Sequence, residues 1–504
     1  MNIKEAREEI CNTVRAYLLR DEAGRYVYPP VRQRPILLMG PPGVGKTAIL
    51  EQAASRCGVG LVAYALTHHT RQSAIGLPHI EKRLFGGREL DVTEYTMSEI
   101  VAAVYDCMER SGKREGILFL DEINCVSETL APTMLQLLQN KSFGSHKLPE
   151  GWVLVTAGNP PEYNRAVREF DVATLDRVRQ IDIEPDCGVW LEYAWEHGVH
   201  GAIVSYLGIR PEHFYQVEER EDGRDFVTAR GWEDLSELIR GYETLDVPFT
   251  AAVAAQYLRK DEIAKSFAAY YQLYRHYGTD YAIPALLSGE LDAEARAAKA
   301  QMAGQGGFEE RLTVVQLILD CLGAEFRRYA RADRRTAALH QALSQLKGQW
   351  NGQAAPVTLE QFRVQREDSL RVKIQAGLLE RPAREAEEWV IDTLRRYDLL
   401  LKRERLGGNA AGFDALRREF QKEVEGRGTL ASGLLARLER AFSFVLDSFG
   451  DGQELLLLVS GLTRSPLAAA FLSEHPCKAY LQYSEKLLFR RQERQLQEQC
   501  AELL

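Results

Sequence analysis

The fold of this chain is decided by the stretch Gly40-Pro41-Pro42-Gly43-Val44-Gly45-Lys46-Thr47. An apolar run at residues 36–39 precedes it, and a helical pattern at 48–53 follows it. The order of strand, glycine-rich turn and helix start places backbone N–H groups around phosphates at the positive end of a helix. The two inner glycines let the backbone close on the phosphates, while Lys46 supplies positive charge and Thr47 a hydroxyl for Mg²⁺. The stretch therefore predicts a site for a nucleotide and its metal ion.

Three further apolar runs predict strands at residues 60–65, 116–120 and 152–157. Helical patterns separate them, at 97–105 and at 130–138. Strands that alternate with helices indicate a parallel sheet covered on both faces. Ligands of such sheets collect at the carboxyl ends of the strands, so we expect the polar residues there to form one site.

Polar side chains follow two of these predicted strands. The run 116–120 ends in Asp121 and Glu122, and the run 152–157 is followed by Asn159. We assign Asp121 to Mg²⁺, Glu122 to polarising the attacking water, and Asn159 to orienting that water. Solvated acids at a strand end would be the favoured interpretation of the carboxylates alone. Because these carboxylates lie downstream of a phosphate loop in the sequence, the catalytic interpretation is favoured instead.

An arginine close before the next predicted strand, at 180–183, is the candidate for neutralising the charge of the transition state. A planar guanidinium that reaches the γ-phosphate is the usual means. We assign this role to Arg177, although isolated arginines are more often surface salt-bridge partners. Three rivals stay open: Arg165, Arg168 and Arg179.

Taken together, these motifs resemble those of AAA+ ATPases of the MoxR-like group. This group lies in the helix-2-insert branch, which also holds magnesium chelatase subunits and dynein-related ATPases. The resemblance covers about residues 1–280 and is carried by Gly40–Thr47, Leu120–Asn124, Thr156–Pro161, Leu175–Val178 and the segment Thr228-Ala229-Arg230-Gly231-Trp232-Glu233-Asp234-Leu235. It implies hydrolysis of ATP with Mg²⁺, and an α/β AAA+ core with a parallel sheet and a phosphate loop.

The resemblance also implies a domain plan and partners. The core would span residues 1–185, with an insert at about 67–96, and a helical lid would span 186–278. Arg230 would touch the nucleotide from the start of a lid helix. Similar proteins assemble into a homo-oligomeric ring, usually a hexamer, in which Arg177 would serve the neighbouring subunit's site. They act as chaperone-like remodelling machines on a protein client, often beside a partner with a von Willebrand factor A domain.

The insert is expected to be an interrupted helix that carries a β-hairpin with Gly86-Gly87 at its centre. The adjacent pair His68-His69 within it suggests a metal site. Neighbouring histidines do not lie on one face of a helix, however, and no acidic partner is evident, so a structural role is favoured.

Composition limits the alternatives. The 504 residues exceed one hydrophobic core, which predicts two to four domains. Eight cysteines occur singly, as in reduced cytosolic proteins, and residues 1–19 have no apolar core, so we expect a cytoplasmic protein without a membrane anchor. A net charge of −9 without a basic stripe argues against nucleic acid. The alternative function is a nucleic-acid-stimulated AAA+ motor of restriction or translocase type. A nucleotide-gated scaffold is disfavoured because Glu122 and Asn159 are both present.

Residues 279–504 are predicted to form an all-α extension without a catalytic constellation. Some seven helical segments are expected in 349–504, because breaks are predicted near Gly348–Gly352, Pro382, Gly407-Gly408, Gly426–Gly428, Gly450–Gly452, Ser465-Pro466 and Pro476. We expect this region to serve ring contact and partner docking, with simple packing that completes the fold as the alternative.

Overall fold

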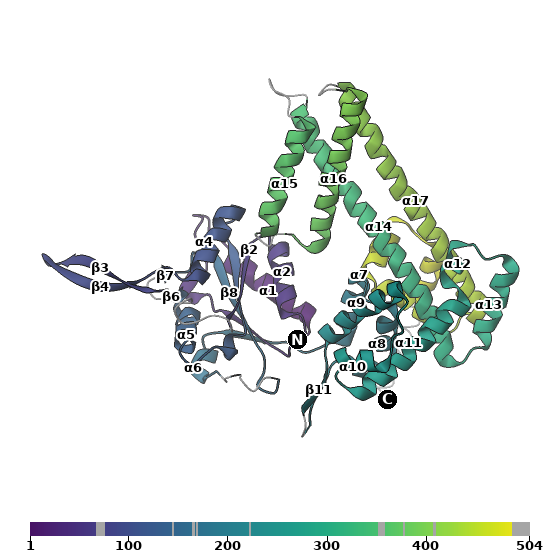
Figure 1. The fold of residues 1–504 in the computed structure, drawn as a ribbon, viewed down its shortest axis with the longest axis horizontal. Helices are drawn as coiled ribbons and strands as arrows, with labels where there is room; N and C mark the ends of the chain where they lie inside the picture. Colours follow the sequence, from purple (N-terminus) through teal and green to yellow (C-terminus); the bar gives the residue numbers. More distant parts are fainter. Residues whose placement is uncertain are drawn as a thin grey trace, which may run out of the picture. The chain divides into compact units, whose positions relative to one another are not determined.

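The computed structural model describes residues 1–66, 76–143, 146–163, 167, 170–220, 223–350, 358–375, 379–406 and 410–485 (Figure 1). The chain divides into two compact units. The first consists of Met1–Asp186 and Gln361–Ile391, and the second of Cys187–Glu360 and Asp392–Leu504. The predicted lid therefore lies in the same unit as most of the C-terminal helices. Four of the candidate site residues lie outside the described ones: His68, His69, Arg165 and Arg168. Gly352, Gly407 and Gly408 of the predicted breaks also lie outside them.

The first unit is built on the predicted parallel sheet. Five strands pair in one sheet, and each neighbouring pair is parallel. Their order across the sheet is β2 (Gly60–Ala65), β5 (Gly116–Asp121), β8 (Trp152–Gly158), β1 (Ile36–Met39) and β9 (Arg179–Asp182). Every residue of β8 is buried, as expected for a central strand covered on both faces.

Helices cover both faces of this sheet, and the strand residues alternate between them. Ile117 and Phe119 pack in one cluster with α1 (Ile3–Tyr17) and α2 (Lys46–Cys57), whereas Leu118 packs in the other. The second cluster contains α4 (Glu99–Ser111) and α5 (Ala131–Asn140). Because successive side chains of a strand point to opposite faces, one apolar run fills two cores. The predicted α/β fold is confirmed.

The insert carries the predicted hairpin. Strands β3 (Pro78–Phe85) and β4 (Arg88–Tyr95) pair antiparallel, and both glycines of the turn have positive φ. Two such residues in succession form the tight turn that suits the twist of a hairpin. Ile80 and Leu84 are 76% and 73% exposed, so the hairpin presents apolar side chains to solvent. The helical part expected just before it lies outside the described residues.

The second unit begins with an aromatic helical core. Trp232 and Phe267 are both fully buried and meet edge to face, with ring centroids 5.3 Å apart. Further aromatic side chains of the predicted lid pack in the same core. The elements are α7 (Cys187–His197), α8 (Gly201–Ile209), β10 (Gln216–Arg220), β11 (Gly223–Val227), α9 (Ala229–Leu245), α10 (Ala251–Tyr257) and α11 (Asp261–Tyr281). The hairpin of β10 and β11 was not predicted.

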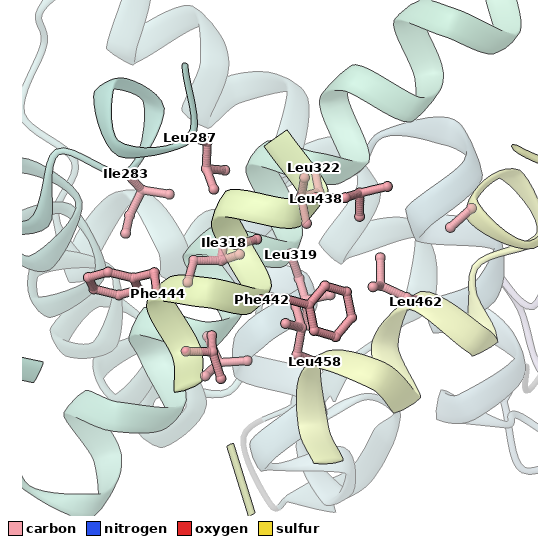
Figure 2. Packing of buried hydrophobic residues seen from close by; sticks show 14 of the residues in the cluster. Ile283, Leu287, Ile318, Leu319, Leu322, Leu438, Phe442, Phe444, Leu458 and Leu462 are labelled. Atoms are coloured by element: carbon pink, nitrogen blue, oxygen red, sulfur yellow. The ribbon is translucent and has the colours of Figure 1, made fainter. Parts of the chain in front are cut away.

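The C-terminal helices share one apolar core, in which Ile318, Leu322, Leu438, Phe442 and Leu458 come together (Figure 2). The core is formed by α12 (Ile283–Ser288), α13 (Ala293–Gln305), α14 (Phe308–Trp350), α17 (Ala410–Phe449), α18 (Gln453–Arg464) and α19 (Pro466–Glu474). Two further helices are α15 (Leu359–Gln375) and α16 (Arg381–Glu404). The predicted all-α character is confirmed, with six helical stretches rather than seven in the described part of 349–504, the last of them at 478–485.

In the described part of the chain, no single helix has the length and apolarity needed to cross a membrane. Helices α18 and α19 meet these criteria only as a pair, and the pair is bent by 88°.

The predicted break at Gly426–Gly428 is wrong, because α17 continues through it to Phe449. Glycine costs about 1 kcal/mol in a helix interior. The intervening Arg427 offsets this cost by binding two other helices: its Nε pairs with Asp333 of α14 at 2.7 Å, and its Nη2 pairs with Glu474 of α19 at 3.4 Å. Nη2 also donates to the hydroxyl of Tyr329 at 3.1 Å. Tertiary contacts thus override the local signal.

Arg427→Ala should lower the free energy of unfolding of the second unit by about 1–2 kcal/mol, since partly exposed charge-assisted contacts to α14 and α19 are lost. Urea denaturation followed by circular dichroism measures this change. Arg418→Ala is the control, because Arg418 is exposed on the same helix. Equal losses in the two variants would contradict the role given to Arg427.

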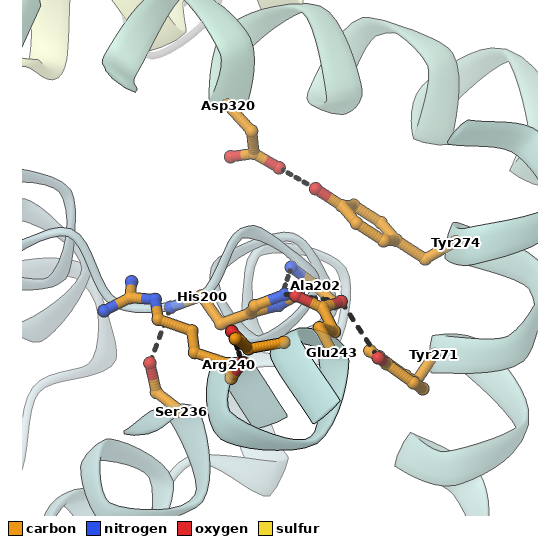
Figure 3. Close-up of polar contacts among 9 residues, drawn as sticks. His200, Ala202, Ser236, Arg240, Glu243, Tyr271, Tyr274 and Asp320 are labelled. Atoms are coloured by element: carbon orange, nitrogen blue, oxygen red, sulfur yellow. Dashed lines mark hydrogen bonds and ion pairs between the residues drawn. The ribbon is translucent and has the colours of Figure 1, made fainter. Parts of the chain in front are cut away.

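A polar seam joins α14 to the lid. The hydroxyl of Tyr274 in α11 donates to Asp320 of α14 at 2.7 Å (Figure 3). Gly201 at the start of α8 lies against the same carboxylate, because a Cβ there would be 2.3 Å from Oδ2. Arg327 donates to the carbonyl oxygen of Trp195 at 2.9 Å. Lid and α14 therefore pack too closely to slide past each other without breaking buried contacts.

Beside this seam, His200 orders the start of α8. Its backbone N–H donates to Ser236 at 2.8 Å, and its Nδ1 accepts from the N–H of Ala202 at 3.2 Å (Figure 3). Its Nε2 lies 3.2 Å from both carboxylate oxygens of Glu243, which also accepts from Tyr271 at 2.9 Å. The hydrogen bond from His200 lowers the pKa of Glu243. The lid helices are thus linked by a satisfied polar network.

Asp320→Asn should make the second unit less sensitive to pH. Burial raises the pKa of Asp320 from 3.8 to about 6, against the opposing effects of Tyr274, His200, Arg327 and Gln316. The folded state therefore holds this proton more tightly than the unfolded state, and the contribution of Asp320 to stability is largest below pH 3.8 and declines through pH 6. Asparagine keeps an acceptor for Tyr274 and does not ionise.

The free energy of unfolding of the variant, relative to that of the wild type, should accordingly rise by about 2 kcal/mol as the pH is raised from 4.5 to 7.5. Urea denaturation at both pH values measures this difference. A stability difference that stays constant with pH would show that Asp320 does not titrate in this range.

Candidate nucleotide site

The phosphate loop joins β1 to α2 through a backbone that requires glycine. Gly43 and Gly45 have φ values of 79° and 96°, in the left-handed region that favours glycine. Gly40 lies against the chain after β9, because a Cβ on it would be 2.8 Å from the carbonyl oxygen of Ile183. Helix α2 begins directly after Gly45, so the N–H end of the helix adjoins the loop. The loop is therefore shaped to receive an anion at a helix N-terminus.

Lys46 links the loop to the strand on its other side. It is only 8% exposed, and its Nζ donates to the carbonyl oxygens of Gly40 at 2.7 Å and Pro41 at 3.0 Å. The same Nζ donates to Oδ1 of Asn159 at 2.8 Å. The ammonium group is thus held inside the loop, next to the amide that we assigned to the attacking water.

Thr47 and Asp121 bring two hard oxygen ligands together. The hydroxyl of Thr47 donates to Oδ2 of Asp121 at 3.3 Å, although 74 residues separate them in the sequence. A hydroxyl and a carboxylate beside a phosphate loop are ligands that Mg²⁺ prefers, so the residues present fit this ion. Glu122 follows with φ 57° and ψ 38°, a left-handed conformation rare for glutamate. Such backbone strain is found most often at functional sites.

Asn124 positions Asn159 and had no role assigned from the sequence. It is 3% exposed, and its Nδ2 donates to the carbonyl oxygen of Asn159 at 2.8 Å. It also packs against Gly158, where a Cβ would lie 2.7 Å from its Oδ1. The only signal in the sequence was its place directly after the acidic pair, which does not distinguish a buried amide from a loop residue.

The structure describes two of the four candidate arginines, Arg177 and Arg179. Arg177 is exposed just after the short helix α6 (Val172–Leu175). Arg179 instead donates to Thr13 of α1 at 2.6 Å and pairs with Glu9 of the same helix, so it holds β9 to α1. Arg177 is therefore favoured over Arg179. Arg230 is exposed at the start of α9, in the second unit.

At the start of α6, Asp171 caps the helix that precedes Arg177. Its carboxylate accepts from the N–H of Thr174 at 2.8 Å. Hydrogen bonding from Thr174, and then the charge of Arg177, lower the pKa of Asp171. The cap fixes where the helix begins and thereby the register of the arginine after it.

A second group of possible metal ligands lies on the β3–β4 hairpin. His79, Glu81 and Glu94 place their ligand atoms within 4.8 Å of one another. Arg83 pairs with Glu81 at 3.6 Å and also with Glu94, so both carboxylates already have a cation. We assign no metal to this exposed group.

The main cluster can perform phosphoryl transfer from a nucleotide to water. Hydrogen bonds join Lys46 to Asn159 and Thr47 to Asp121, and Glu122 follows Asp121 in the chain. These residues lie at or after the carboxyl ends of β1, β5 and β8, which are neighbours in the sheet. A lysine for phosphate charge, oxygen ligands for a metal ion and an acid for the water are what this reaction requires.

Comparison with known protein families gives a match to part of the first unit. Residues 35–178 match the family of AAA domains of the dynein-related subfamily. A crystal structure of a candidate ATPase from Cytophaga hutchinsonii ATCC 33406 is 14% identical, and the match covers 36% of this chain and 46% of that chain with a TM-score of 0.23. The match thus spans about half of that protein. No curated protein matches the chain. The family match is confined to residues 35–178, which hold the phosphate loop and the polar residues after β5 and β8.

Proposed function

We propose that this chain is an ATPase, a MoxR-like AAA+ machine that remodels or activates a protein client. In this proposal the subunits form a ring, with six as the expected number, and act beside a partner that carries a von Willebrand factor A domain. The observation that carries the proposal is a complete hydrolytic cluster in one subunit together with Arg177, an exposed arginine after α6. A guanidinium at the protein surface is the group that would contact a neighbouring subunit's γ-phosphate.

The residues divide the chemistry between them. Lys46 and the loop N–H groups bind the phosphates, and Glu122 takes the proton of the attacking water while Asn159 orients that water. Thr47 and Asp121 would hold Mg²⁺, which supplies charge neutralisation at the phosphates when bound. Asn124 acts through Asn159 and is a positioning residue. Hydrolysis in one subunit would then be coupled to its neighbour through Arg177.

Mixing two inactive variants tests whether Arg177 acts in trans. Lys46→Ala removes phosphate binding and Arg177→Ala removes the guanidinium, so neither variant alone should hydrolyse ATP. A mixed ring can place an intact site beside an intact Arg177, and ATPase activity should therefore return. Arg179→Ala serves as the comparison, because this arginine binds α1 and its variant should stay active.

If the mixture stays inactive although the subunits co-assemble, Arg177 acts within its own subunit or another arginine serves. Sedimentation with a slowly hydrolysed ATP analogue checks the assembly and counts the subunits. ATPase activity that DNA or RNA stimulates in a salt-dependent way would favour the nucleic-acid motor instead.

A further inference from the structure

A cavity of about 340 Å³ lies in the second unit between α12, α14 and α17. Glu325 and Arg328 of α14 line it together with Arg437 and Arg440 of α17, and Ser288 closes the side of α12. We call this cavity the arginine pocket. It belongs to a different unit from the phosphate loop, so it is a separate site.

Short residues of α17 keep the pocket open. Gly433 and Ala436 form part of its lining. A Cβ built on Gly433 would meet no atom within 4 Å, so the space above this glycine is free of protein. Glycine is unfavourable in the middle of a helix, and here its effect is to leave room beside charged side chains.

The charges around the pocket are unbalanced. Three arginines and one glutamate line it, which leaves an excess of two positive charges. Glu325 pairs with Arg437, and its Oε2 lies 3.9 Å from Arg328. Arg440 donates from Nη1 to the carbonyl oxygen of Leu287 at 3.0 Å, near the end of α12. Arg437 and Arg440 are therefore held in place by protein groups.

We propose that the arginine pocket binds a small ligand through a phosphate or diphosphate group. Guanidinium groups that converge on one cavity repel each other, and an oxyanion relieves that repulsion. Each guanidinium has five N–H donors in a planar fork that matches phosphate oxygens, so donors remain beyond the contacts described. The volume falls within the range of small-molecule sites and leaves room for more than one inorganic phosphate. The proposal does not depend on the proposed remodelling function.

Isothermal titration calorimetry on the full chain tests this proposal. The titrations use the Lys46→Ala chain, whose phosphate loop should bind no nucleotide, so that the binding observed reports another site. Inorganic phosphate, pyrophosphate and AMP are then titrated separately. We expect at least one to bind with an affinity that falls as salt rises. The responding compound shows whether free phosphate, diphosphate or a nucleoside phosphate is preferred.

A pair of charge variants locates the binding. Arg328→Gln should weaken it about tenfold, as expected for one lost charge-assisted contact. Arg371→Gln is the matched control and should leave binding unchanged. The two arginines have similar surroundings. The side chain of Arg371 is 67% exposed and lies 3.8 Å from a carboxylate of its own helix. The side chain of Arg328 is 64% exposed and lies 3.9 Å from a carboxylate of its own helix.

A pair of glycine variants tests the cavity itself. Gly433→Leu fills the space without changing any charge and should abolish binding. Gly426→Leu adds the same atoms to the same helix where a Cβ also meets nothing, and it should bind as the wild type does. Leucine favours helix over glycine, so both variants should melt no lower than the wild type. The proposal is overturned if none of the three compounds binds, or if Gly433→Leu binds as well as Gly426→Leu.

Discussion

A Lys46→Ala chain should bind no ATP, whereas a Glu122→Gln chain should bind ATP and hydrolyse it at least about 100-fold more slowly than the wild type. Lys46 is buried inside the loop, with its Nζ on two loop carbonyls and on Asn159, so it faces charge that is present before reaction. Glu122 instead acts on water during the chemical step. Loss of a ground-state contact removes binding, and loss of a base removes turnover.

Nucleotide binding by fluorescence and phosphate release measured separately distinguish the two effects. Glu150→Gln is a suitable control, because Glu150 is an exposed glutamate of the same unit. Turnover near the wild-type rate in Glu122→Gln would show that another group activates the water. Undiminished ATP affinity in Lys46→Ala would show that the loop N–H groups alone hold the phosphates.

A chain that ends at Gly348 should fail to fold its second unit. Helices α17, α18 and α19 contribute Leu438, Phe442, Phe444, Leu458 and others to the same core as α14, and these side chains are almost completely buried (Figure 2). Each large apolar side chain contributes about 2 kcal/mol by burial. The removed residues together exceed the whole stability of an ordinary domain, which is about 5–15 kcal/mol.

Limited proteolysis and size-exclusion chromatography of the shortened chain check this prediction. We expect rapid cleavage within 187–348 and aggregation through the uncovered face of α14. The truncation leaves Met1–Asp186 with its nucleotide site in place but removes Gln361–Ile391 of the same unit, so ADP binding shows whether the site forms without these residues. A protease-resistant second unit with the wild-type melting temperature would refute the shared core. Partner docking by these helices is therefore better tested with surface substitutions than with truncation.

The sequence predicted the sheet well because the apolar runs and the glycines or acids that follow them indicate the same strand ends. The apolar run before Gly40 and the run before Asp121 are buried in the central strands β1 and β5. Gly86-Gly87 likewise formed the turn of the expected hairpin. Gly426–Gly428 was misjudged because the opposing contacts come from Asp333 and Glu474, far away in the sequence. Local propensity cannot include such contacts.

The residue types of the site were also predictable, but their connections were not. Lys46 and Asn159 are 113 residues apart, and only the sheet order brings β1 beside β8. The role of Asn124 depends on a hydrogen bond to a backbone oxygen, for which a sequence gives no signal. The polar seam at Asp320 was missed for a related reason, since an aspartate within a helical pattern is usually exposed.

Because the polar seam fixes α14 to the lid, a rotation of the lid would also rotate this long helix. The helix has 43 residues, which corresponds to about 65 Å at 1.5 Å per residue, and Asp320 lies 30 residues before its end at Trp350. Trp350 is therefore about 45 Å from Asp320, where the lid contacts the helix. A lid rotation of about 10° transverse to the helix axis would carry that end through about 8 Å. A small rotation of the lid would thus displace the far end of α14 by more than the width of a side chain.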